Sequence, residues 1–63
     1  MTRLLLMTGE ALEVDGALET VAKQLEDAAR SSAGALAWFT ESSTGEKIGL
    51  NPVHVVTLRA ADG

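Results

Sequence analysis

The chain has 63 residues, and nine Asp and Glu against five Lys and Arg give it a formal net charge of −4. A domain of this length buries only about 60% of the surface that its unfolded chain exposes, so it commonly needs disulfides, a metal or association to gain stability. The absence of cysteine excludes disulfides, and a single histidine argues against a closed zinc site with about four ligands. Association is the route that remains.

The charge balance and the scattered basic residues argue against nucleic acid as a partner. A net negative charge repels phosphate backbones, and the Lys and Arg residues form no basic run. The first apolar run spans residues 4–7, which is shorter than the roughly 7–15 residues of a secretory signal or the about 20 of a membrane helix. The alanine-rich composition is typical of a GC-rich genome, and we expect a bacterial, cytoplasmic protein that does not bind membranes.

The first half of the chain has the pattern of a β-hairpin followed by a helix. Residues 4–7 are apolar, residues 8–10 resemble a turn, and residues 11–14 alternate, as in two paired strands. Asp15 can cap a helix by accepting a hydrogen bond from a backbone N–H of the first turn. We predict the helix over residues 17–30, because its apolar residues recur as one helical stripe: Ala17, Leu18, Val21, Ala22, Leu25, Ala28 and Ala29.

Three further strands complete the predicted fold. After Gly34, which can end the helix in the left-handed conformation, strand-forming residues occupy 35–41, 46–50 and 55–60, with 42–45 as a hairpin loop. We predict a single α+β domain over the whole chain. It has one amphipathic helix packed on a five-stranded, mostly antiparallel sheet or small open barrel, in the order β-β-α-β-β-β.

Alternation along these strands divides their apolar residues between two faces. The face predicted to form the core holds Leu12, Val14, Leu36, Trp38, Ile48, Leu50, Val56 and Leu58. The opposite face, with Leu5 and Met7 or their neighbours and with Ala35, Ala37, Phe39 and Val55, is less polar than a solvated sheet face should be. Either the sheet closes into a barrel, or this face meets a partner. In the second case the predicted partner-binding residues are Leu5, Phe39 and Val55, with Phe39 as the aromatic anchor.

No set of residues in the sequence has the pattern of a catalytic, metal or cofactor site. Asn51 and Pro52 are the residue types that cap and begin a short helical turn, so we interpret them as a turn between the last two strands. His54 has no nucleophile or orienting carboxylate at a diagnostic spacing, and we interpret it as the start of the last strand. The acidic residues lack the spacing of a calcium loop and are interpreted as a solvated face. We expect no enzyme activity and no cofactor.

Two resemblances to known families add to this interpretation. Residues 16–59, with the helix ALETVAKQLEDAA and the segment GALAWFTESSTGEKIGLNPVHVVTLR, resemble a small actinobacterial family of uncharacterised proteins with the same order of strands and helix. That resemblance implies a fold and no site. The segment KIGLNPVHVVTLR is similar to the last strands of the carbon-storage regulators, which are small RNA-binding dimers. Thr2-Arg3 with Gly9-Glu10 is similar to their first strand. The likeness implies that Arg3 and Arg59 contact RNA, although those proteins are basic and have strands where a helix is predicted over 17–30.

Two functions follow as expectations. The first is a small, acidic, non-enzymatic interaction module that self-associates or binds another protein. The alternative is an RNA-binding regulator.

Overall fold

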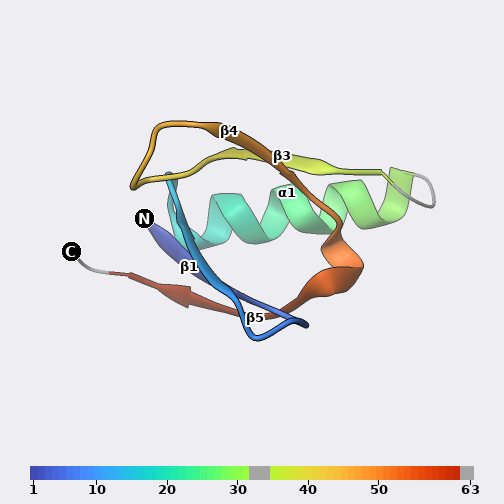
Figure 1. Ribbon diagram of the computed structural model, residues 1–63. Coiled ribbons are helices and arrows are strands. Elements are labelled where there is room, and N and C mark those ends of the chain that lie inside the picture. The colour runs from blue at the N-terminus through green and yellow to red at the C-terminus, as the bar shows by residue number, and fades with distance from the viewer. Residues whose placement is uncertain (32–34, 62–63) are drawn as a thin grey trace.

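The computed structural model describes residues 1–31 and 35–61, and there it contains one α-helix, one 3₁₀ turn and five strands (Figure 1). The elements are β1 (Thr2–Leu6), β2 (Ala11–Val14), α1 (Leu18–Ser31), β3 (Ala37–Thr40), β4 (Lys47–Leu50), η1 (Pro52–His54) and β5 (Val55–Ala60). The predicted α+β class and element order are confirmed. The helix stop predicted at Gly34 lies outside the described residues.

The strands form two antiparallel sheets rather than one five-stranded sheet. One sheet has the order β2-β1-β5, and the other pairs β3 with β4. A single bridge between Val14 and Glu41 joins them, supported by the Asp15 N–H, which donates to the Thr40 carbonyl at 2.9 Å. Beyond it, the chain turns at Gly16, whose φ of 116° is strained for other residues, and enters α1. The helix therefore begins where β2 would otherwise have continued along β3.

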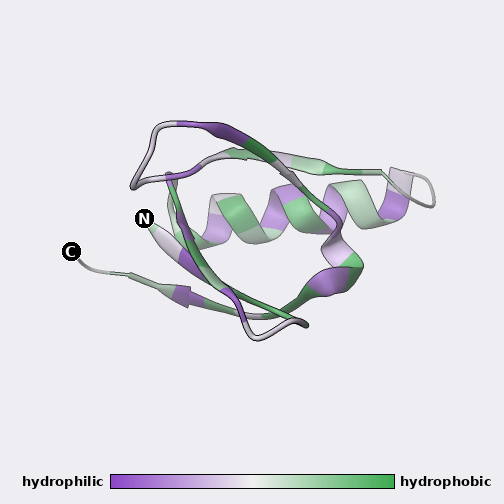
Figure 2. Ribbon diagram, viewed as in Figure 1, coloured by the Kyte–Doolittle hydropathy of each residue, from purple (hydrophilic) through white to green (hydrophobic). Residues whose placement is uncertain are grey.

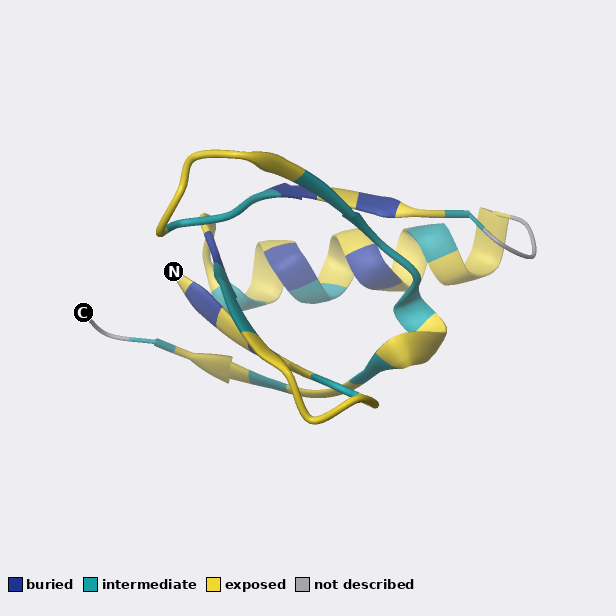
Figure 3. Cartoon of the chain, in the orientation of Figure 1, coloured by how far each residue is buried: buried dark blue, intermediate teal, exposed yellow. Residues whose placement is uncertain are grey.

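A small core lies between the two sheets and the helix (Figures 1 and 3). Its buried apolar side chains are Leu4, Val14, Val21, Leu25, Ala37 and Phe39, with Ala28, Ile48, Leu50, Val55 and Leu58 packed around them. Figure 2 shows that α1 alternates between hydrophobic and hydrophilic residues, as the predicted stripe requires. The buried Thr2 hydroxyl donates to the Gly16 carbonyl at 3.0 Å, which ties β1 to the turn before α1.

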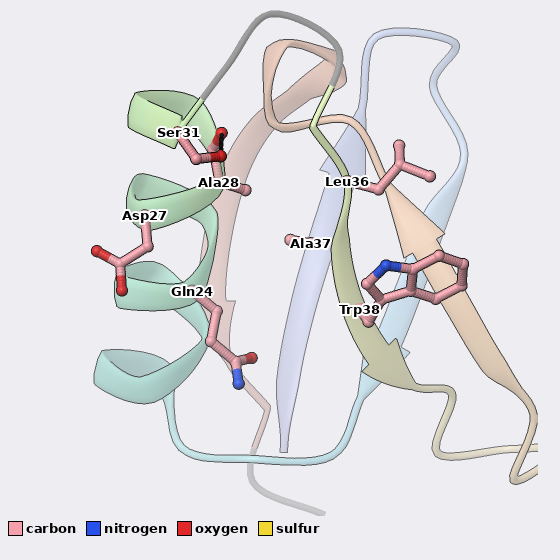
Figure 4. Close-up of a pocket in the computed structure, with 7 residues that line it drawn as sticks. All are labelled: Gln24, Asp27, Ala28, Ser31, Leu36, Ala37 and Trp38. Atoms are coloured by element: carbon pink, nitrogen blue, oxygen red, sulfur yellow. Dashed lines mark hydrogen bonds between the residues drawn. The ribbon is translucent and has the colours of Figure 1, made fainter.

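The faces predicted for β3 are wrong. Ala37 and Phe39 are 4% and 5% exposed, whereas Leu36 and Trp38 are 45% and 57% exposed. The pairing of β3 with β4 explains the difference, because Phe39 lies opposite Ile48 on the core side. A small residue is needed at Ala37, where β3 faces the helix (Figure 4). The aromatic residue predicted as a partner anchor is therefore part of the core.

The faces predicted at the start of β5 are also wrong. The register between β1 and β5 pairs Leu5 with Thr57 and Leu6 with Val55, so Val56 is an extra residue. Such a bulge inverts the alternation locally. Val55 consequently packs against the core, and Val56 is exposed.

The turn between β4 and β5 is a capped 3₁₀ helix. The Asn51 side-chain oxygen accepts the Val53 N–H at 3.0 Å, and Pro52 occupies the first helical position, as the sequence predicts. The His54 side chain is exposed, while its backbone carbonyl accepts the Met7 N–H at 2.8 Å. The segment thus fixes the direction of β5 through its backbone.

Candidate interaction surfaces

The described residues contain no group of three or more His, Asp or Glu side chains that could hold a metal ion. Nor does that part of the chain contain a helix with the length and apolarity needed to cross a membrane. Two exposed surfaces, on the outer sides of the two sheets, are candidates for interaction.

The first surface, here called the tryptophan strip, consists of Trp38 on the outer side of β3 and Leu36, the residue just before this strand. Trp38 lies opposite Gly49 of β4. A Cβ added at Gly49 would stand 3.1 Å from the Trp38 ring and 3.1 Å from Leu36 Cδ1, so both side chains rest on this glycine. Covering a glycine with an aromatic ring stabilises a strand pair, yet more than half of Trp38 stays open to solvent. The strip is therefore an exposed apolar surface on a firm backbone support.

A groove of about 430 Å³ lies beside the strip, between α1 and β3 (Figure 4). Its lining residues are Gln24, Asp27, Ala28, Ser31, Leu36, Ala37 and Trp38. Figure 4 shows that Ala37 points toward α1, whereas Leu36 and Trp38 point away from it. The small side chains of Ala28 and Ala37 thus face each other between α1 and β3, and Leu36 and Trp38 line the groove from the β3 side.

The second surface, here called the sheet face, is the outer side of β2-β1-β5. Its side chains form two rows across the three strands. One row runs Glu13, Arg3, Arg59, and the next runs Ala11, Leu5, Thr57. A hollow of about 270 Å³ lies over this face, lined by Arg3, Leu5, Ala11, Thr57 and Arg59.

The charged row contains one ion pair and one pair of like-charged neighbours. Arg3 Nη2 donates to Glu13 Oε2 at 3.0 Å, with both side chains partly exposed. On its other side Arg3 lies directly opposite Arg59. Like charges at such positions are destabilising, and within the described residues Arg59 forms no ion pair. Among the described residues, the β5 edge of the sheet face therefore carries a cation, Arg59, that no ion pair neutralises.

The three residues predicted to bind a partner do not form one surface. Leu5 lies at the centre of the sheet face and is 37% exposed. Phe39 is in the core, and Val55 is half-buried against it. Alternation predicts Trp38 inside the core, although Gly49 in β4 signals otherwise, because a strand glycine often marks close approach of another group. The register that joins Arg3 to Arg59 had no such local signal.

Comparison with protein-family models, curated proteins and solved structures finds no match to this chain. In the described residues the protein is a compact α+β domain of two small sheets and one helix, with two candidate interaction surfaces.

Proposed function

We propose that this chain is a non-enzymatic, cytoplasmic protein-interaction module that self-associates. The observation that carries the proposal is the exposure of apolar side chains on the outer sides of both sheets, Trp38 above all. Tryptophan is enriched among the residues that dominate binding energy at protein interfaces. Self-association through either surface would cover apolar groups that the monomer exposes.

The size of the core supports the same proposal. Six apolar side chains are buried among the described residues, and only Leu4 and Val14 are wholly inaccessible to solvent. Each large apolar side chain that becomes buried contributes roughly 1.5–3 kcal/mol, so an association that covers further apolar groups stabilises a small domain appreciably.

Light scattering after gel filtration tests the proposal. At micromolar concentration the wild type should have a mass above that of a monomer, and dilution should reduce it. The variants Trp38→Ser and Leu5→Ser then separate the two surfaces. The substitution on the contacting surface should weaken association at least about tenfold, while the other leaves it unchanged. A wild type that stays monomeric at every concentration would contradict self-association.

A second candidate, an RNA-binding regulator, is favoured by one observation. Arg3 and Arg59, which the likeness to the carbon-storage regulators pairs as RNA contacts, are direct neighbours across β1 and β5. Two arginines side by side can each contact a phosphate, and the hollow beside them is accessible.

RNA binding would depend steeply on salt. For two phosphate contacts on a single strand, the logarithm of the affinity should fall with the logarithm of salt concentration with a slope of about −1.4. Fluorescence anisotropy with a labelled single-stranded RNA measures this slope. The substitution Arg3→Glu should abolish RNA binding. An unchanged anisotropy at low salt would eliminate this candidate.

A further inference from the structure

We propose that the chain forms a two-fold dimer by stacking its sheet face on the sheet face of a second copy. The inference rests on the proposed self-association and names the surface that it uses. Three features of the sheet face support it: the order of charges across β2-β1-β5, the free hydrogen-bonding capacity of these charged groups, and the hollow around Leu5.

The charges of the sheet face are ordered across the sheet. Glu13, Arg3 and Arg59 share one row, so the β2 edge is negative and the β5 edge is positive. Neighbouring strands lie about 4.8 Å apart, which puts the backbones of Glu13 and Arg59 roughly 10 Å from each other. A face with one negative and one positive edge is complementary to a copy of itself in which these edges are exchanged.

A two-fold axis parallel to β1 makes that exchange. It stacks β1 on β1 of the second copy, and it places β2 of each copy over β5 of the other. Residues keep their level along the strands, so Glu13 faces Arg59 of the second copy, and the same pair forms again on the other side of the axis. Stacked sheets cross at about 30°, which displaces groups this close to the axis only slightly. Because both copies use the same patch, the assembly closes at two subunits.

The groups that would form these pairs have free bonding capacity. Arg3 uses only Oε2 of Glu13, and among the described residues Oε1 accepts no hydrogen bond. A carboxylate can accept hydrogen bonds at both oxygens. Glu13 can therefore bind Arg3 of its own chain and, at the same time, Arg59 of the second copy. Near the axis, Arg3 faces Arg3 of the second copy. The repulsion between these two arginines is reduced because each already forms an ion pair with Glu13 of its own chain. The new pairs therefore break no existing contact in the described structure.

The second row supplies an apolar centre for the same axis. Leu5 lies between Ala11 and Thr57, two small residues, and the hollow above them has a volume of about 270 Å³. Two stacked sheets bring Leu5 of each copy to this hollow, where the small neighbours leave room for it. Excluding water there also strengthens the flanking ion pairs, because charges interact more strongly in a medium of lower dielectric constant.

Charge reversal with mixing tests the dimer. Glu13→Arg alone, or Arg59→Glu alone, makes like charges face each other twice, and each variant should self-associate at least about tenfold more weakly than the wild type. When the two variants are mixed, each reversed position faces an opposite charge on the other chain. Sedimentation equilibrium of the mixture should then show a heterodimer with an affinity within about threefold of the wild type.

Matched controls separate the interface from net charge. Glu46→Arg and Lys47→Glu change the net charge by the same amounts but lie at the β3–β4 hairpin, away from the sheet face, and should leave association unchanged. Far-UV circular dichroism confirms folding, since the Arg3–Glu13 pair that Glu13→Arg removes is exposed and worth about 1 kcal/mol at most.

Two results would overturn the dimer while leaving the proposed function intact. One is a wild type that self-associates but is insensitive to both reversals. The other is a pair of weakened variants that do not recover on mixing, which would mean that the two positions do not face each other. A wild type without self-association overturns both proposals.

Discussion

Replacing Phe39 by alanine should lower the free energy of unfolding by about 3–5 kcal/mol, the usual cost of truncating a buried phenylalanine. Phe39 is 5% exposed and packs in the cluster that holds the two sheets and the helix together. At roughly 0.05–0.15 kcal/mol per residue, a chain of 63 residues has a total stability of only about 3–9 kcal/mol. The variant should therefore lose at least about a third of its stability and, at the lower end of this range, unfold completely; urea titration followed by circular dichroism measures the loss.

The matched control is the preceding residue. Trp38→Ala removes a larger side chain, but that side chain is mostly exposed and contributes chiefly through its contact with Gly49. A cross-strand contact of this kind is worth about 0.2–1 kcal/mol. If Trp38→Ala proved as destabilising as Phe39→Ala, the assignment of faces in β3 would be incorrect.

The helix can be predicted well because it depends on one local property, the spacing of apolar residues along the chain. Val21 and Leu25 recur on one stripe of α1, and both are buried. Asn51 and Pro52 likewise predict η1, because the cap and the first helical position depend on residues next to each other in sequence. Features that a few neighbouring residues determine are thus accessible without a structure.

The faces of β3 could not be predicted in the same way. Leu36, Ala37, Trp38 and Phe39 are apolar in succession, so alternation places an apolar residue on each side and does not choose between them. The choice depends on what lies opposite: the core side packs against α1 and Ile48, and the outer side rests on Gly49. Those partners are set by tertiary pairing.

The division of the strands into two sheets and the charged row of the sheet face could not be predicted for the same reason, because both depend on which strands pair. Gly16 permits the turn that leads the chain from β2 into α1, and nothing in a strand pattern states that β3 then begins a second sheet. Arg3 and Arg59 are far apart in sequence, and only the pairing of β1 with β5 makes them neighbours. Net charge argues against a cationic edge, yet a local row of side chains can oppose the charge of the whole chain.

Replacing Leu4 by alanine should cost about 2–5 kcal/mol of unfolding free energy, because it leaves a cavity in the central strand of the larger sheet. Leu4 is fully buried and lies opposite Leu12 on one side and Leu58 on the other. The neighbouring Leu5 points to the opposite side, into the sheet face. Leu5→Ala should therefore change the unfolding free energy by less than about 1 kcal/mol, as is usual near the surface.

The two variants should also separate folding from association. Leu5→Ala should keep the thermal stability of the dilute protein and weaken self-association, since Leu5 is the apolar centre of the proposed dimer. Leu4→Ala should lower thermal stability at every concentration, because its side chain supports the monomer. Thermal unfolding measured over a range of protein concentrations distinguishes them: a concentration-dependent midpoint in the wild type should become flat for Leu5→Ala. A midpoint that stays equally concentration-dependent in Leu5→Ala would place the contact elsewhere, on the tryptophan strip.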